Sequence, residues 1–118
     1  MQNLNFEPLV LKKTYELYKQ LYHQIEKFPK RNRYTIGEKI ETNLLELIEN
    51  ITLANIQIKT LREPILHKAS AKCDICKVLF RLSYDLNLIS NRQYIELSSK
   101  ISEIGKMIGG WIKFTRNQ

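Results

Sequence analysis

The chain has 118 residues, of which nineteen are Lys or Arg and twelve are Asp or Glu, so its formal net charge is +7. A chain of this length can bury more than half of its unfolded surface, and we expect one domain over residues 1–118 that needs no disulfide scaffold. Its apolar runs fall far short of the roughly 20 residues that cross a bilayer, and the polar start at Gln2, Asn3 and Asn5 is unlike a leader. We expect a cytoplasmic protein with an anionic partner and no membrane contact.

The first of four segments with helical spacing covers residues 8–27. The pair Phe28-Pro29 ends it, because proline disfavours helical geometry in the residue before it. The apolar stripe predicted for this helix is Leu11, Tyr15, Tyr18, Tyr22 and Ile25. The three tyrosines suggest either core packing or an aromatic platform on which bases stack, and their spacing on the stripe favours the core.

The second and fourth helices begin at sequences that match capping boxes, Thr35-Ile-Gly-Glu38 and Ser90-Asn-Arg-Gln93. The third begins near Pro64, a residue that the first turn of a helix tolerates. The second stripe is Ile40, Leu44, Leu47, Ile51, Ala54, Ile58 and Leu61, and the fourth is Tyr94, Leu97, Ile101, Ile104, Ile108 and Trp111. Short connections between long amphipathic helices predict an all-α, antiparallel up-down-up-down four-helix bundle with an elongated shape.

The third helix is apolar over an arc of about 200°, roughly twice what a surface helix needs. Its predicted central face is Ile75, Leu79, Leu82 and Leu86, continuing to Ile89, and the arc widens through Ala69, Cys73, Cys76, Phe80 and Ser83. The excess indicates either a broad core contact or packing against another subunit. We favour the second explanation and expect a homo-oligomer. Phe80 is predicted to take part in oligomer or helix packing.

Cys73-Asp-Ile-Cys76 has the spacing of a zinc or disulfide-exchange motif. It stands alone, since the two histidines, His23 and His67, form no second ligand pair and no strand precedes it. Ordinary buried cysteines are the better interpretation, so no metal and no cofactor is expected. The chain also lacks a phosphate-binding glycine loop and a nucleophile with a positioned histidine, and we expect no enzymatic activity.

Basic residues gather in two places. Around the first connection they are Lys27, Lys30, Arg31, Arg33 and Lys39, which suit either a solvated loop or a phosphate-contacting patch. On the third helix Lys77 and Arg81 lie one turn apart between two aspartates, Asp74 and Asp85. The aspartates can pair with them at the surface, at an energy of only tenths of a kcal/mol.

Three of the four glycines lie in the segment Ser102-Glu-Ile-Gly-Lys-Met-Ile-Gly-Gly-Trp-Ile-Lys113. Each costs about 0.5–1 kcal/mol relative to alanine inside a helix, so a compensating interaction is expected. Gly105 and Gly109 are one turn apart, and their small size would let another helix approach closely, with Trp111 as an anchor. Gly110 is more simply explained as loosening the helix before the tail.

This same segment, from Glu103 to Lys113, resembles the terminal signature of the accessory variability proteins of diversity-generating retroelements. These proteins belong to a wider group of small four-helix proteins related to rRNA intervening-sequence proteins. The resemblance extends over most of the chain through Lys27-Phe-Pro-Lys30, Tyr34-Thr-Ile-Gly37 and Asp85-Leu-Asn-Leu-Ile-Ser90 followed by Tyr94.

The resemblance implies a non-catalytic homopentamer that binds DNA and RNA and the retroelement's reverse transcriptase during mutagenic retrohoming. Lys77 and Arg81 match a pair of basic family positions, although Lys77 stands where arginine is expected and lacks its fork of donors. Two other functions stay open at this point. One is a stand-alone bundle of the rRNA intervening-sequence group with an RNA or protein partner, and the other is a CxxC metal or redox protein.

Overall fold

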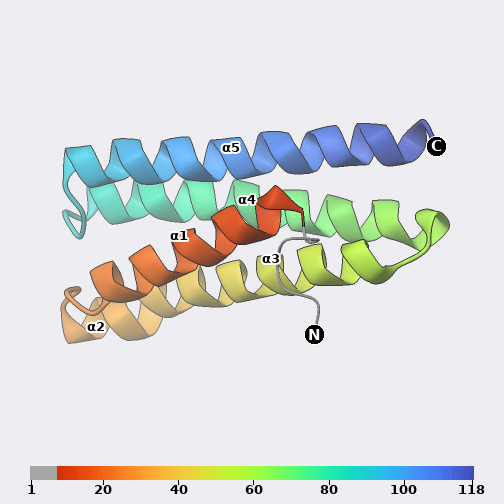
Figure 1. The fold of residues 1–118 in the computed structure, drawn as a ribbon. Helices are drawn as coiled ribbons and strands as arrows, with labels where there is room; N and C mark the ends of the chain where they lie inside the picture. The colour runs from red at the N-terminus through yellow and green to blue at the C-terminus, as the bar shows by residue number, and fades with distance from the viewer. Residues whose placement is uncertain (1–7) are drawn as a thin grey trace.

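The computed structural model of the chain describes residues 8–118, which form helices and no strand. The elements are α1 (Leu9–Ile25), α2 (Lys30–Asn32), the π-helical η2 (Arg33–Gly37), α3 (Glu38–Ile56), α4 (Lys59–Asp85) and α5 (Asn91–Arg116). Helices α1 and α4 run against α3 and α5 and pack on both of them, as Figure 1 shows. The antiparallel up-down-up-down bundle is therefore confirmed, as is its elongated shape of 46 × 29 × 22 Å.

Aliphatic side chains from all four long helices form one core cluster. On α3 the predicted stripe is confirmed from Ile40 to Ala54, and on α5 from Leu97 to Ile108, each residue being at most 1% exposed. Burying one such leucine or isoleucine side chain contributes about 1.5–3 kcal/mol. This core holds the helices in register and leaves their outer faces to carry other groups.

The start of the second helix differs from the prediction. Pro29 occupies the N-cap position and helical geometry begins at Lys30, so the chain is already helical when it reaches Thr35. The Thr35 hydroxyl donates to the carbonyl oxygen of Arg31 at 2.9 Å and caps nothing. The predicted capping box at Thr35-Ile-Gly-Glu38 is wrong, because the proline starts the helix earlier.

The end of the second helix also differs. Helix α3 stops at Ile56, and Ile58 and Leu61 are 66% and 53% exposed, so their predicted place on the core stripe is wrong. Arg62 explains the stop, since its guanidinium donates to the carbonyl oxygens of Ala54 at 3.0 Å and Gln57 at 2.9 Å. These carbonyls would otherwise lack partners at the helix end.

Helix α4 is longer at its start and shorter at its end than predicted. It begins at Lys59, so Pro64 lies inside the helix and does not open it. It ends at Asp85 because Asn87 adopts a left-handed conformation with φ of 61°, which lets the Leu88 amide donate to the Ser83 carbonyl at 2.8 Å. Asparagine tolerates this conformation at a helix end better than most residues.

The second predicted capping box is confirmed at the start of α5. The Gln93 amide donates to Ser90 Oγ at 3.1 Å, and the Ser90 amide donates to Gln93 Oε1 at 2.8 Å. This reciprocal pair satisfies two backbone donors that the first turn of a helix leaves free.

Helix α1 presents a different face to the core than predicted. Its buried residues are Val10, Leu11, Thr14, Leu17, Leu21 and Ile25. Of the predicted stripe, Leu11 and Ile25 are confirmed as core residues and Tyr18 packs against the core, whereas Tyr15 and Tyr22 are 46% and 47% exposed, so their predicted core positions are wrong. Thr14 occupies a core position because its hydroxyl donates to the Val10 carbonyl at 2.8 Å and needs no other partner.

The glycine whose lack of a side chain the fold requires is Gly37, outside the cluster near the C-terminus. A Cβ placed there would lie 2.7 Å from Ile25 Cγ2 and 3.2 Å from the Asn32 carbonyl oxygen. Gly37 ends η2 where it passes the last turn of α1. This close approach joins the first two long helices.

We predict that Gly37→Ala lowers the free energy of unfolding by about 1–3 kcal/mol, because the added methyl group overpacks this contact. Gly110→Ala is the matched control, since a Cβ at Gly110 meets nothing within 4 Å among the described residues. The control should gain about 0.5–1 kcal/mol from helix propensity. Urea unfolding of both variants measures the difference, and equal stability of Gly37→Ala and the unchanged protein would contradict the contact.

Candidate nucleic-acid and partner interface

The wide apolar arc of α4 is confirmed, but most of its predicted central face is exposed. Of the residues predicted for that face, Leu79 packs partly against the core and Ile89, beyond the helix, is buried. The core side is Leu66, Ala69, Cys73, Cys76, Phe80 and Ser83. Three residues that the sequence placed on the central core face, Ile75, Leu82 and Leu86, are instead exposed. With Val78 they form an outer strip whose four side chains are between 41% and 66% exposed. Phe80 is fully buried, so it packs helices within the chain and is not available to a second one.

Lys77 and Arg81 border this outer strip. With Val78, Leu82 and Asp85 they line a shallow depression of about 410 Å³ on the surface of α4. Two cations at the edge of exposed apolar surface suit contact with an acidic protein surface as well as with phosphate groups. The sequence identified the two cations, but it did not predict that Val78 and Leu82 form an exposed apolar surface beside them.

Both cations already have carboxylate partners on their own helix. Lys77 Nζ lies 3.8 Å from Asp74 Oδ1, and Arg81 Nε donates to Asp85 Oδ1 at 3.0 Å. The hydrogen bond to Asp85, and after it one with Tyr94, raises the pKa of Arg81, so this residue stays charged. Exposed pairs of this kind contribute about 0–1 kcal/mol, and an incoming phosphate or carboxylate group can replace the aspartates.

The basic residues around the first connection do not form one patch. Lys30 and Arg31 are exposed on α2, whereas Arg33 turns partly inward and its guanidinium lies 5.8 Å from the Tyr34 ring centroid. Arg33 shares a cleft of about 380 Å³ with two tyrosines and three glutamates: Tyr22, Tyr34, Glu26, Glu38 and Glu41. Of the three predicted contacts at this connection, only Lys30 and Arg31 are fully presented to solvent.

The two basic regions lie toward the same end of the rod. Figure 1 shows that this end holds the turn between α1 and α2 and the turn between α4 and α5. The α3–α4 turn and the C-terminus lie at the other end. Lys77 and Arg81 belong to the last third of α4, which leads to this end. The bundle therefore places the predicted nucleic-acid or partner-binding residues toward one end but on different helices.

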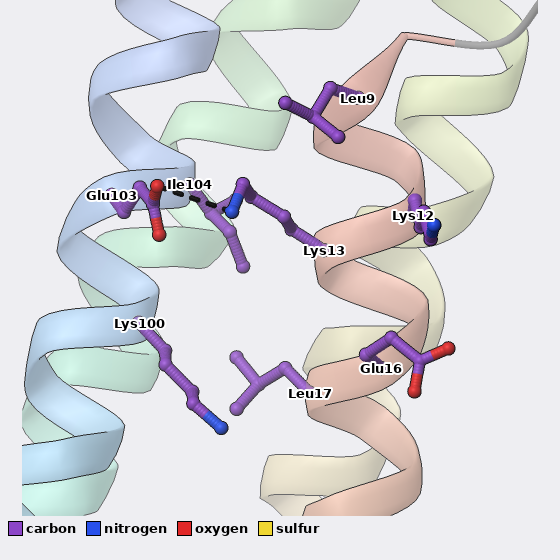
Figure 2. A pocket seen from close by; sticks show the side chains of 8 residues that line it. All are labelled: Leu9, Lys12, Lys13, Glu16, Leu17, Lys100, Glu103 and Ile104. Atoms are coloured by element: carbon purple, nitrogen blue, oxygen red, sulfur yellow. Dashed lines mark ion pairs between the residues drawn. The ribbon is translucent and has the colours of Figure 1, made fainter.

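A second cleft separates α1 from α5 (Figure 2). It has a volume of about 360 Å³ and an apolar floor that includes Leu17 and Ile104. Lys13 reaches across it to Glu103, with an Nζ to Oε2 distance of 3.2 Å. Lys12, which is exposed, also lines this cleft from α1.

The glycines of α5 do not act as a pair within the chain. A Cβ at Gly105 would lie 3.8 Å from Cys73 Cβ, an ordinary van der Waals contact, and one at Gly109 meets nothing within 4 Å in the described part of the chain. Close helix approach at Gly109 is therefore wrong for this single chain. Trp111 packs against the core with part of its ring. Approach of another chain at Gly105, Gly109 and Trp111 stays a prediction.

The CxxC cysteines are ordinary core residues, as predicted. Both are free, and Cys73 and Cys76 are 1% and 0% exposed. Burial raises the pKa of each thiol from 9.0 to about 12. Among the described residues no three His, Cys, Asp or Glu side chains gather as a metal site requires. A protonated, buried thiol pair is unsuited to redox exchange, which needs an accessible thiolate.

None of the helices in residues 8–118 combines the length and the apolar character needed to cross a membrane.

Comparisons with known proteins give the family of the chain and support its fold. The model of the bAvd-like family matches residues 9–115. The chain belongs to the bAvd-like family. This membership supports an Avd-type accessory role in general. No curated protein shows detectable sequence similarity.

A solved structure supports the fold assigned to this bAvd-like chain. The crystal structure of a protein with unknown function from the S23 ribosomal protein family of Bacteroides thetaiotaomicron superposes with a TM-score of 0.80. The alignment covers 89% of this chain and 96% of that one at 18% identity. At this identity the likeness shows the shared fold.

The buried thiols give a direct test of the α4 core face. Below pH 9 the thiols should be protonated in the folded protein, since their pKa is about 12 there. We predict that iodoacetamide at pH 8 alkylates neither Cys73 nor Cys76 until urea unfolds the chain, when both react within minutes. Mass spectrometry counts the added groups, and rapid labelling of the folded protein would contradict the burial.

Proposed function

We propose that the chain is a non-catalytic, nucleic-acid-binding accessory subunit that associates with a retroelement reverse transcriptase during mutagenic retrohoming, in the cytoplasm. Membership of the bAvd-like family over residues 9–115 is the observation that carries this proposal. The net charge of +7 supports it, because a basic accessory protein attracts the phosphates of DNA and RNA.

The exposed apolar surface of α4 supports assembly into a homopentamer. The outer strip of Ile75, Val78, Leu82 and Leu86 has the residue composition of an interface core, and solvent exposure of such a surface is unfavourable. In a closed ring of five subunits the net charge would reach about +35, which would gather polyanions from solution. Lys77 and Arg81 would then lie at the rim of each subunit contact.

These two cations are proposed to contact nucleic acid, the reverse transcriptase or both. Lys77 and Arg81 are exposed. Lys77 pairs with Asp74 at 3.8 Å and Arg81 with Asp85 at 3.0 Å, and because both ion pairs lie at the surface, an anionic group of a partner can replace either aspartate. In the free protein Asp74 and Asp85 reduce the local positive potential. An anionic partner would have to compete with them.

We predict that Lys77→Gln combined with Arg81→Gln preserves the folded oligomer and weakens binding to nucleic acid or to the cognate reverse transcriptase by at least tenfold. The opposite change, Asp74→Asn combined with Asp85→Asn, should strengthen the same interaction, because it frees both cations. Titrations of each variant against a labelled oligonucleotide and against the reverse transcriptase measure the two effects.

The pattern across the two partners decides the role of the pair. A loss confined to the reverse transcriptase assigns the pair to protein contact, and a loss confined to the oligonucleotide assigns it to phosphate contact. If neither the glutamine double variant nor the asparagine double variant changes the affinity for the oligonucleotide or for the reverse transcriptase, Lys77 and Arg81 are solvated surface charges. The proposed site would then move to Lys30 and Arg31.

A further inference from the structure

The outer face of α1 carries cations and aromatic rings in alternation. Lys12, Tyr15, Lys19 and Tyr22 follow one another at steps of three, four and three residues, which places them within an arc of about 80°. We call these four residues the α1 stripe. It lies on the side of the helix away from the buried residues Leu17 and Leu21, and all four of its side chains are exposed.

In the α1 stripe a lysine ammonium group lies close to a tyrosine ring. Lys19 Nζ lies 5.1 Å from the centroid of the Tyr15 ring. Lys12 is exposed and is one of the residues that line the neighbouring cleft between α1 and α5 (Figure 2). Seven residues separate Tyr15 from Tyr22, a rise of about 10 Å along the helix. That length corresponds to roughly three nucleotides of one strand at about 3.4 Å each.

Acidic groups on or beside the stripe are few, and two of them are paired. Glu16 Oε1 lies 3.5 Å from Lys19 Nζ, and Glu26 Oε1 lies 3.5 Å from His23 Nδ1. Both are surface pairs that a phosphate can displace. The first half of the stripe, from Lys12 to Lys19, is therefore the part suited to phosphate contact.

The second half is suited to a base. Tyr22 forms one wall of the cleft that Arg33 and Tyr34 share with three glutamates. Glutamate oxygens there can accept hydrogen bonds from base amino groups. The Arg33 Nε atom is buried with no hydrogen-bond partner among the described residues, and it can donate to a base oxygen or nitrogen. A phosphate is disfavoured in this cleft by the three carboxylates.

We propose that the α1 stripe binds single-stranded nucleic acid, with Tyr15 and Tyr22 stacking on bases and with Lys12 and Lys19 contacting phosphates. This inference rests on the proposed nucleic-acid binding and places it on α1. Single-strand binders combine these two elements, a cationic track and aromatic rings. A duplex presents its phosphates but keeps its bases stacked, so it can use the lysines and not the tyrosines.

The test is an equilibrium titration of the full chain with a fluorescent 20-nucleotide single strand, as DNA and as RNA, and with a blunt duplex of the same sequence. We expect Tyr15→Leu combined with Tyr22→Leu to weaken single-strand binding at least tenfold and duplex binding less than twofold. Tyr15→Phe combined with Tyr22→Phe keeps both rings and should bind like the unchanged protein. Circular dichroism confirms that each variant is folded.

The lysines are tested with a charge-matched control. Lys12→Gln combined with Lys19→Gln should weaken single-strand binding several-fold. Lys68→Gln combined with Lys113→Gln removes the same charge from exposed positions on α4 and α5 and should have a smaller effect. Equal losses in the two pairs would overturn the role of the stripe lysines.

Failure of this inference is distinguishable from failure of the proposed function. If the unchanged protein binds both ligands and the leucine variant binds the single strand equally well, the α1 stripe is overturned and nucleic-acid binding stands. If the unchanged protein binds no oligonucleotide at low salt, both proposals fail. Loss of binding in the phenylalanine variant would also overturn base stacking, because the rings are still present.

Discussion

The packing of α4 is the constraint on which the rest of the structure depends. This helix lies between α3 and α5, and its small and aromatic core residues, from Ala69 through Cys73 and Cys76 to Phe80, fill the space between them. The thiols stay protonated because this space excludes water. With one face of α4 used in this way, its second apolar face remains uncovered in the single chain.

The uncovered face explains why the sequence of α4 was harder to interpret than those of α3 and α5. On α3 and α5 one strict stripe of aliphatic residues had a single possible partner surface, and the predicted core from Ile40 to Ala54 and from Leu97 to Ile108 was correct. On α4 two apolar faces compete, and hydrophobicity favoured Ile75 and Leu82 over the smaller residues that the crowded interior accepts. The inward face combines the small Ala69, Cys73 and Cys76 with the large Leu66 and Phe80, and periodicity alone does not distinguish it from the outer face.

A related competition accounts for α1 and for the helix ends. Tyrosines and aliphatic residues both follow helical spacing on α1. The buried face is mainly aliphatic, and the hydroxyl that it carries, on Thr14, is satisfied by the Val10 carbonyl within the helix. The ends of α3 and α4 depend on Arg62 and on Asn87, which act through hydrogen bonds with carbonyl groups across a turn. The hydrogen bonds of Arg62 to carbonyls of the preceding helix follow no sequence motif and could not be predicted. The capping box at Ser90 and Gln93 has a known motif and was predicted.

Of the candidate site, the sequence located the charges and the structure located the surfaces around them. Two distinct surfaces emerge: the outer strip of α4 with Lys77 and Arg81 at its edge, and the exposed α1 stripe. The proposed function needs one surface for the polyanion and one for a protein, whether a second copy of the chain or another partner, and the two surfaces lie on different helices.

The central claim is that a second copy of the chain covers the outer strip of α4, and the molar mass in solution tests it most directly. Multi-angle light scattering at micromolar concentration should give about five times the chain mass of 14.0 kDa. Val78→Glu combined with Leu82→Glu should reduce it to a folded monomer, while Ile95→Glu, at an exposed position on α5, should leave the assembly intact. A stable monomer of the unchanged protein would contradict the account.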